Sequence, residues 1–117
     1  MPSKKHRPTK DEREHKGRVA QMSCIVSGMR PVVVHHKTGA GMGLRASDWE
    51  VMPLTPYRHV EAPYGECVHR GTRTFEEKFG TQEELITKTY HKLALQYPEL
   101  YGENGRLRHH VPSYVYE

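Results

Sequence analysis

The sequence predicts a small α+β domain, and three features support this fold class. The run Val32–Val34 consists of β-branched residues, which favour a strand. Thr81 and Glu84 match a capping box, in which a Thr side chain begins a helix and a Glu three positions on bonds back to it. The chain has 117 residues, of which 35% are hydrophobic, so one domain with a small core is expected.

Basic residues dominate segment 1–10, which has no apolar periodicity and is expected to be a flexible basic arm. A solubilising tail and a phosphate-contacting arm both remain open for it. Residues 11–22 are expected to form a short helix, because Asp11 and Glu12 would lie at the end where the helix dipole favours negative charge.

The middle of the chain is expected to contain short strands. A hairpin is predicted, with a first strand at Ile25–Val26, a turn at Gly28–Arg30 and a second strand at Pro31–His36. The segment Gly39–Gly43 holds three glycines and predicts a permissive loop. Another short apolar piece follows at Glu50–Leu54, and its proline argues for an edge strand or a strand that runs into a loop.

A longer helix is predicted to begin after Thr81 and to run to about Gln96, before Pro98 ends it. Its apolar stripe consists of Leu85, Ile86, Thr89 and Leu93. The Gly, Pro and Asn residues of segment 102–117 predict an extended tail on the surface. The expected organisation is therefore an arm at 1–10, a domain at 11–101 and a tail at 102–117.

Composition narrows the class of protein. The net charge of +4 favours a polyanionic partner. Cys24 and Cys67 are too few for a disulfide scaffold. No apolar run reaches the roughly 18 residues that a transmembrane helix needs, and no apolar stretch follows the basic N-terminus as in a secretory signal. A cytoplasmic protein without a membrane partner is expected.

The nine histidines are the unusual feature of the composition. His35 and His36 close the predicted strand, and His59 and His69 follow after a loop and another short strand. Such a path can bring imidazoles together around one divalent cation and leave positions open for water and a phosphate oxygen. Adjacent residues of a regular strand face opposite sides, and scattered histidines often lie on surfaces. Spacing alone leaves both readings open.

A wider pattern resembles the HNH endonuclease superfamily, and within it the phage recombination-enhancement (Ref-like) nucleases. The resemblance covers roughly residues 19–96. The matching elements are Cys24–Gly28, His35-His36, Gly41–Gly43, Asp48, Pro53-Leu54, His59, and the stretch His69–Gly80 with its Phe75-Glu76.

The resemblance implies a small ββα-metal (HNH-type) domain, with flanking helices and extended termini, that hydrolyses DNA phosphodiester bonds. It implies that His36 is the general base and that His35, His59 and His69 bind one divalent metal ion, namely Mg, Mn, Ni or Zn. Imidazole has a reference pKa of about 6.5, which suits proton abstraction from water near neutral pH.

Two departures from the family pattern change what is expected. The family commonly holds a structural zinc with two ligand pairs, which here read Cys24 with Ser27 and Thr55 with Arg58. Only one of these four residues is a usual zinc ligand, so no structural zinc is expected.

The Asn that names the motif is also missing. Asp48 and Glu50 lie near its place, and either could orient His36 by accepting its second ring N–H.

The expected partner is single- or double-stranded DNA. Phosphate contacts are expected from five basic residues, although a solvated rim is the alternative for them: Lys37, Arg45, Arg58, Arg70 and Arg73. Two other functions stay open. One is a nucleic-acid-binding module that has lost catalysis. The other is a phage factor that acts on a host recombination or replication protein, in the host cytoplasm, through segment 102–117.

Overall fold

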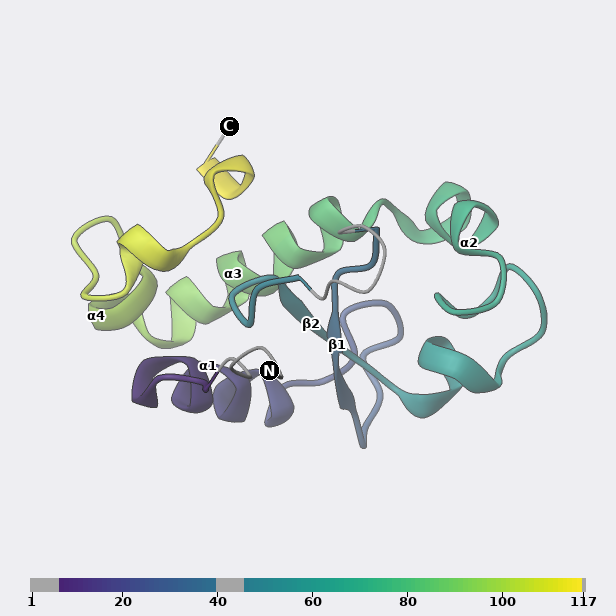
Figure 1. The fold of residues 1–117 in the computed structure, drawn as a ribbon, viewed down its shortest axis with the longest axis horizontal. Helices are drawn as coiled ribbons and strands as arrows, with labels where there is room; N and C mark the ends of the chain where they lie inside the picture. Colours follow the sequence, from purple (N-terminus) through teal and green to yellow (C-terminus); the bar gives the residue numbers. More distant parts are fainter. Residues whose placement is uncertain (1–6, 40–45, 117) are drawn as a thin grey trace, which may run out of the picture.

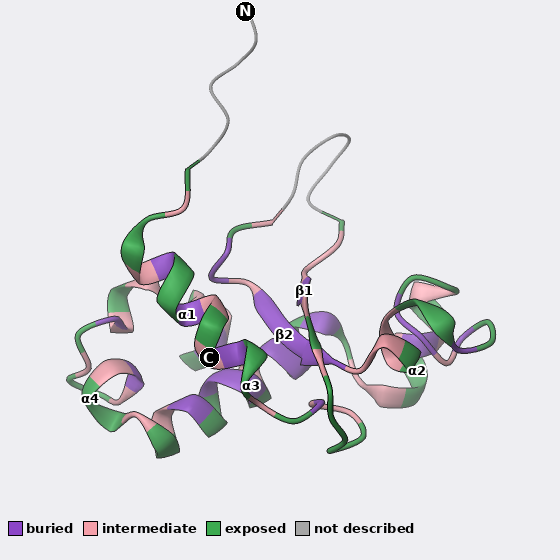
Figure 2. Cartoon of the chain, turned by 90° about the horizontal axis from the view of Figure 1, so that it is seen from below, coloured by how far each residue is buried: buried purple, intermediate pink, exposed green. Residues whose placement is uncertain are grey.

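A two-stranded antiparallel sheet lies at the centre of the fold in the computed structural model, which describes residues 7–39 and 46–116 (Figure 1). Strand β1 spans Val33–His36 and strand β2 spans Val51–Leu54. Their register pairs His35 with Met52 and His36 with Val51. All four residues of β2 are buried, whereas β1 is only partly covered (Figure 2). The α+β class expected from the sequence is confirmed.

The predicted strand at Ile25–Val26 is wrong. Residues 24–28 form a tight turn, in which Gly28 N–H donates to Cys24 O and Cys24 N–H donates to Met29 O. Gly28 has a φ of 73°, which an L side chain rarely adopts, and this glycine lets the chain turn early. Strand β1 therefore pairs with β2 instead.

Pro53 occupies an interior position of β2, opposite Val34. Its carbonyl accepts a hydrogen bond of 2.9 Å from Ile25 N–H, on the side of β2 away from β1. The N and O of one residue point to the same side of an antiparallel strand, so the missing N–H also falls on that outer side. Pro53 therefore costs no backbone hydrogen bond between β2 and β1.

Two capped helices pack against the sheet. Helix α1 spans Lys10–Ala20, and helix α3 spans Gln82–Gln96. Both begin with a capping box, from Thr9 for α1 and from Thr81 for α3. The two predicted helices are confirmed. Because Lys10 is helical, an arm cannot extend over the whole of segment 1–10, and residues 1–6 lie outside the described part of the chain.

The C-terminal segment, expected as an extended tail over 102–117, folds back onto the domain. After helix α4 at Pro98–Tyr101 come two short 3-10 helices, η2 at Arg108–His110 and η3 at Ser113–Tyr116. Leu107, Val111 and Val115 are buried, and η3 packs against α3. The segment therefore contributes to the core. In the described residues, no helix is both long and apolar enough to cross a bilayer.

Candidate metal centre

Three histidines from three segments meet at one end of β1. His35 comes from β1, His59 from the π-helix η1 at Tyr57–Glu61, and His69 from the loop before helix α2 at Thr72–Phe79. Each offers one ring nitrogen, and these nitrogens lie within 4.8 Å of one another. Nε2 of His59 lies 3.1 Å from Nε2 of His69. His35 is buried, His59 is half-buried and His69 is exposed, so the cluster reaches the surface.

Backbone pairing brings His59 and His69 together. Val68 N–H donates to Arg58 O at 2.8 Å, and His69 N–H donates to His59 O at 3.1 Å. The bond from Ala62 N–H to Tyr57 O closes the π-helical turn. Such turns are rare and often occur at functional sites.

A glycine closes the loop between the two histidines. Gly65 has a φ of 82°, and a Cβ placed there would lie 2.6 Å from Thr74 Cγ2. A side chain at this position would therefore disturb the loop that brings His69 to His59.

The cluster suits one transition-metal ion. Two imidazole nitrogens at about 2.1 Å from a shared ion lie about 3.0 Å apart at a right angle and about 3.4 Å apart at a tetrahedral angle. The 3.1 Å between His59 and His69 falls in this range. The third nitrogen lies no farther than 4.8 Å, so a small side-chain adjustment would complete the set. Three ligands leave open positions, as in catalytic rather than structural sites.

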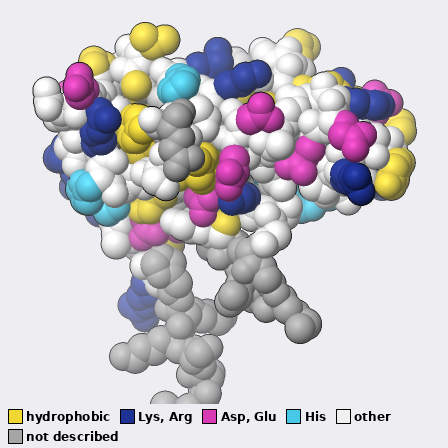
Figure 3. All heavy atoms as spheres, turned by 90° about the horizontal axis from the view of Figure 1, so that it is seen from above, with side chains coloured by type: hydrophobic (Ala, Val, Ile, Leu, Met, Phe, Trp, Pro, Cys, Tyr) yellow, Lys and Arg dark blue, Asp and Glu magenta, His cyan; other side chains and the backbone are white. Residues whose placement is uncertain are grey.

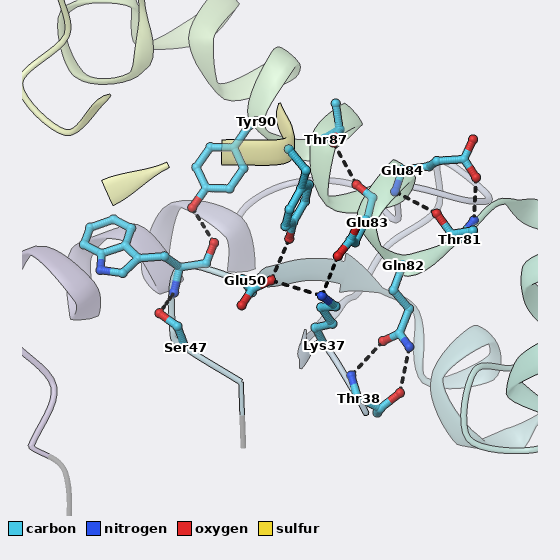
Figure 4. A network of polar contacts seen from close by, with 12 residues as sticks. Lys37, Thr38, Ser47, Glu50, Thr81, Gln82, Glu83, Glu84, Thr87 and Tyr90 are labelled. Carbon is cyan, nitrogen blue, oxygen red and sulfur yellow. Dashed lines mark hydrogen bonds and ion pairs between the residues drawn. The ribbon is translucent and has the colours of Figure 1, made fainter. Parts of the chain in front are cut away.

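Gln82 fixes the orientation of His35, and sequence reasoning did not find it. Its Oε1 lies 2.9 Å from His35 Nε2. The same oxygen accepts from Thr38 N–H at 3.0 Å, and the Gln82 Nε2 donates to Thr38 Oγ1 at 2.7 Å (Figure 4). An oxygen that faces these groups makes His35 Nε2 the protonated nitrogen. His35 Nδ1 is then free to bind an ion. The sequence does contain one signal for it: helical spacing places the polar Gln82 on the same face as the apolar Leu85 and Ile86, where a buried polar contact is expected.

Two histidines of the cluster, His35 and His59, favour the neutral form. Burial lowers the pKa of His35 to about 4, with the charges of His59 and His69 acting in the same direction, although the Gln82 hydrogen bond opposes them. Burial also lowers the pKa of His59, followed by the charge of His69. Neutral imidazole is the form that binds metals, so protons compete little with an ion near neutral pH.

His36, the next residue of β1, has a different partner. Its Nε2 lies 2.6 Å from Oδ1 of Asp48, whose side chain is 1% exposed. Lys16 of α1 lies 3.5 Å from the other carboxylate oxygen. Of the two carboxylates that the sequence left open, Asp48 contacts His36. Glu50 instead pairs with Lys37 and accepts from the Tyr114 hydroxyl.

The basic residues expected to contact DNA differ in their exposure and in their pairing with acidic groups. Arg70 is exposed beside His69, and Arg73 is exposed with Glu77 at 3.5 Å. Lys37 is paired with Glu83 at 2.7 Å, and Arg58 donates to Glu66 O and lies over the Phe79 ring. Arg45 lies outside the described residues.

Charges of both signs are mixed on one face of the molecule. On the face drawn in Figure 3, basic side chains are interspersed with acidic ones. This face is therefore not a continuous basic surface.

The four positions that resemble a structural zinc site do converge. Cys24 Sγ accepts from Ser27 N–H at 3.4 Å, Thr55 Oγ1 lies 4.0 Å from the same sulfur, and Arg58 N–H donates to Thr55 Oγ1. Hydrogen bonds tie these residues together here. That no zinc binds there stays a prediction.

Comparison with known proteins gives the family. The model of a family described as "Protein of unknown function (DUF968)" matches residues 4–97. The chain belongs to the DUF968 family. The DUF968 match includes the three clustered histidines, His36 and Asp48, and it ends before α4.

A curated relative adds a partial match. The chain is 38% identical over 71 residues to "Uncharacterized protein YdfU" of Escherichia coli (strain K12). That match covers 58% of this chain and 19% of the relative, so the aligned segment spans about a fifth of the relative's length. No solved structure matches the chain.

Proposed function

We propose that this protein is a metal-dependent DNA endonuclease or nickase of HNH type. The proposal rests on one observation: two neighbouring residues of β1, His35 and His36, contact two different sets of partners. His35 joins His59 and His69 with their ligand atoms within 4.8 Å, and His36 contacts a buried carboxylate. One candidate metal ligand and the candidate base are thus consecutive residues of β1.

The donor set decides which ions fit. Three imidazoles with open positions favour Zn, Ni or another first-row ion, whereas Mg usually prefers oxygen donors. When bound, the ion would stabilise negative charge on the phosphate oxygens. Gln82 would hold the His35 ring so that its Nδ1 faces the ion.

His36 would act as the general base. Asp48 accepts a hydrogen bond from Nε2–H, which leaves Nδ1 of His36 without a proton. Nδ1 can then take a proton from water as the water oxygen attacks phosphorus. The bond from phosphorus to the leaving oxygen breaks, and solvent protonates that oxygen. The Asp48 carboxylate stabilises the imidazolium that forms, as a carboxylate partner of a catalytic histidine does.

The cluster is accessible to a large substrate. His69 and Arg70 are both exposed, next to each other in the chain. A duplex or a single strand would approach the cluster from the His69 side, where Arg70 would contact a phosphate.

A plasmid-nicking assay tests the proposal directly. Purified protein would be incubated with supercoiled DNA and Mg, Mn, Ni or Zn in parallel, and elemental analysis would identify the metal retained on purification. We expect conversion to nicked circles with at least one metal. The His59→Ala variant should lose this activity, while His91→Ala, which removes an exposed histidine of α3 outside the cluster, should keep it.

The same assay separates the alternatives. A wild-type protein that binds DNA but nicks it with no metal would be a binding module of the same fold. The missing motif Asn favours that outcome, and the His36–Asp48 contact opposes it. If the protein neither binds nor cuts DNA, the remaining hypothesis is a phage factor that acts on a host protein.

A further inference from the structure

A second concave region lies away from the histidine cluster, where the end of α1, the turn at 24–28 and the last turns of α3 meet. It encloses about 400 Å³, which is enough for a small ligand. None of the clustered histidines lines it. The lining residues that the argument uses are Arg18, Gln21, Ser23, Arg30, Lys92 and Gln96.

The lining carries positive charge without compensation. Arg18, Arg30 and Lys92 all line the cavity, and no Asp or Glu does. Within the described residues, none of the three forms an ion pair with a carboxylate, whereas Lys37 and Arg106 do. Three uncompensated cations around one hollow would raise the local concentration of an anion.

Arg18 is held rigidly at the edge of this cavity. Its Nε donates to the Tyr101 hydroxyl at 2.9 Å, and its guanidinium lies over the rings of Tyr97 and Tyr101. One terminal nitrogen is shielded from water and has no hydrogen-bond partner. A guanidinium that is desolvated in this way is stabilised by a nearby anion more strongly than a solvated one.

Arg30 and the neutral groups complete the set of donors. One terminal nitrogen of Arg30 donates to Gln21 O, at the end of α1, and this bond directs the side chain toward the cavity. The Ser23 hydroxyl and the Gln96 amide also line it. Two guanidinium groups, an ammonium and neutral donors form a recognition set typical of phosphate.

We propose that this cavity binds a phosphate group. The source is either a free phosphate compound, such as a mononucleotide, or the backbone of a nucleic acid strand. The proposal does not depend on the nuclease function, because the cavity shares no residue with the histidine cluster or with the His36–Asp48 pair.

The test is calorimetric titration in metal-free buffer at constant ionic strength, with inorganic phosphate, AMP and a short single-stranded oligonucleotide as separate probes. We expect at least one probe to bind wild type. The Arg30→Gln/Lys92→Gln variant should bind it about tenfold more weakly or worse. The control variant Lys78→Gln/Lys88→Gln removes the same charge at two exposed positions outside the cavity, and it should bind like wild type.

The outcomes are distinct. Binding of phosphate and AMP identifies a free phosphate compound as the source, and binding of the oligonucleotide alone identifies the nucleic acid backbone. No binding of any probe, or an equal loss in the control variant, overturns the proposal. Because no metal is present and no cleavage is measured, neither result bears on the nuclease function.

Discussion

The imidazole Nε2 of His36 lies 2.6 Å from Oδ1 of the nearly fully buried Asp48. A carboxylate can only accept a hydrogen bond, so the bonded ring nitrogen carries the proton. The other ring nitrogen, Nδ1, is therefore the basic one. Lys16 lies 3.5 Å from the second carboxylate oxygen, so Asp48 contacts a cation as well as His36.

Asp48→Asn should slow DNA cleavage while leaving metal binding unchanged. The amide cannot fix the ring or stabilise its charged form as a carboxylate does, and this exchange beside a catalytic histidine costs up to about 10⁴-fold in rate. Nicking rates and calorimetric metal titration of the same preparation would check this. The matched control is Glu50→Gln, the neighbouring carboxylate that contacts Lys37 rather than His36. Equal losses in both variants would contradict the assigned role of Asp48.

His36→Ala and His59→Ala should separate proton transfer from metal binding. Without its base, the His36→Ala variant should cleave about two to four orders of magnitude more slowly, with metal affinity nearly unchanged. His59→Ala removes a ligand, so metal affinity and cleavage should decrease together. If His36→Ala abolished metal binding instead, His35 and His36 would have exchanged roles. Unchanged cleavage in both variants would exclude the cluster as the active site.

Gln82→Leu should weaken metal binding without touching a ligand. The substitution leaves His35 Nε2–H and Thr38 N–H without their shared acceptor. The His35 ring is then free to turn, and metal affinity should decrease by about 10–100-fold. Stability should also decrease, by about 1–3 kcal/mol, because buried donors lose their partner. Glu83→Gln, the exposed neighbour on α3, is the control and should leave metal affinity unchanged.

A buried chain of hydrogen bonds defines the protonation state of His15. Arg18 Nε donates to the Tyr101 hydroxyl, which lies 2.7 Å from His15 Nδ1. On the other side, His15 Nε2 lies 3.2 Å from the Tyr90 hydroxyl, which donates to Trp49 O. Tyr90 gives its one proton to Trp49 O, so His15 donates at Nε2. A neutral His15 then accepts the Tyr101 hydroxyl proton at Nδ1, so the neutral ring satisfies both hydroxyl groups.

Acid should destabilise the protein through His15. Burial, and then the charges of Arg18 and His110, lower the pKa of His15 from 6.5 to about 3, against the opposing charge of Asp48. The unfolded state therefore binds more protons between these values. Stability from His15 is complete above pH 6.5 and decreases as the pH falls toward 3, by up to about 1.4 kcal/mol per pH unit.

Urea unfolding from pH 7 to 4 would measure this dependence. His15→Gln removes the titrating group, so its free energy of unfolding should change less steeply with pH than that of wild type. The exposed-site variant His91→Gln should follow the wild-type slope. Parallel curves for wild type and His15→Gln would show that His15 is not responsible.

Chelation should lower the melting temperature only modestly, by about 5 °C at most, because an apolar core rather than a metal holds the elements together. Residues that are not usual zinc ligands surround Cys24, and hydrogen bonds already connect them. Differential scanning calorimetry with and without chelator would measure the change. Complete unfolding on chelation would mean that a structural metal had been missed.

Local signals predicted α1 and α3, because helix-end residues act within one turn, but they did not predict α2 or α4. Thr81 and Glu84 fixed the start of α3, and the β-branched run located β1. Strand pairing is a long-range property, so the sequence suggested a partner at 25–26 instead of β2. Likewise the regular spacing of Leu107, Val111 and Val115 was visible, but the surrounding Gly and Pro residues pointed to an extended tail.

The candidate site was predictable only in part. His35, His59 and His69 were found as a group through the family resemblance, and their convergence in space agrees with it. Gln82 was not found, because its contact with His35 joins residues 47 positions apart. Helical spacing places Gln82 on the buried face of α3, but it does not name the partner on another segment. The choice between Asp48 and Glu50 also needed three-dimensional contacts, since both lie at nearly the same sequence distance from His36.

The proline of β2 has a consequence for self-association. An exposed strand edge offers N–H and C=O groups on which another chain can add a strand and begin aggregation. On the outer edge of β2, Pro53 has no N–H to offer and its carbonyl is already occupied by Ile25. A second molecule therefore finds neither donor nor acceptor at that position. The narrow sheet is protected against edge-to-edge growth there by one imino acid and one turn.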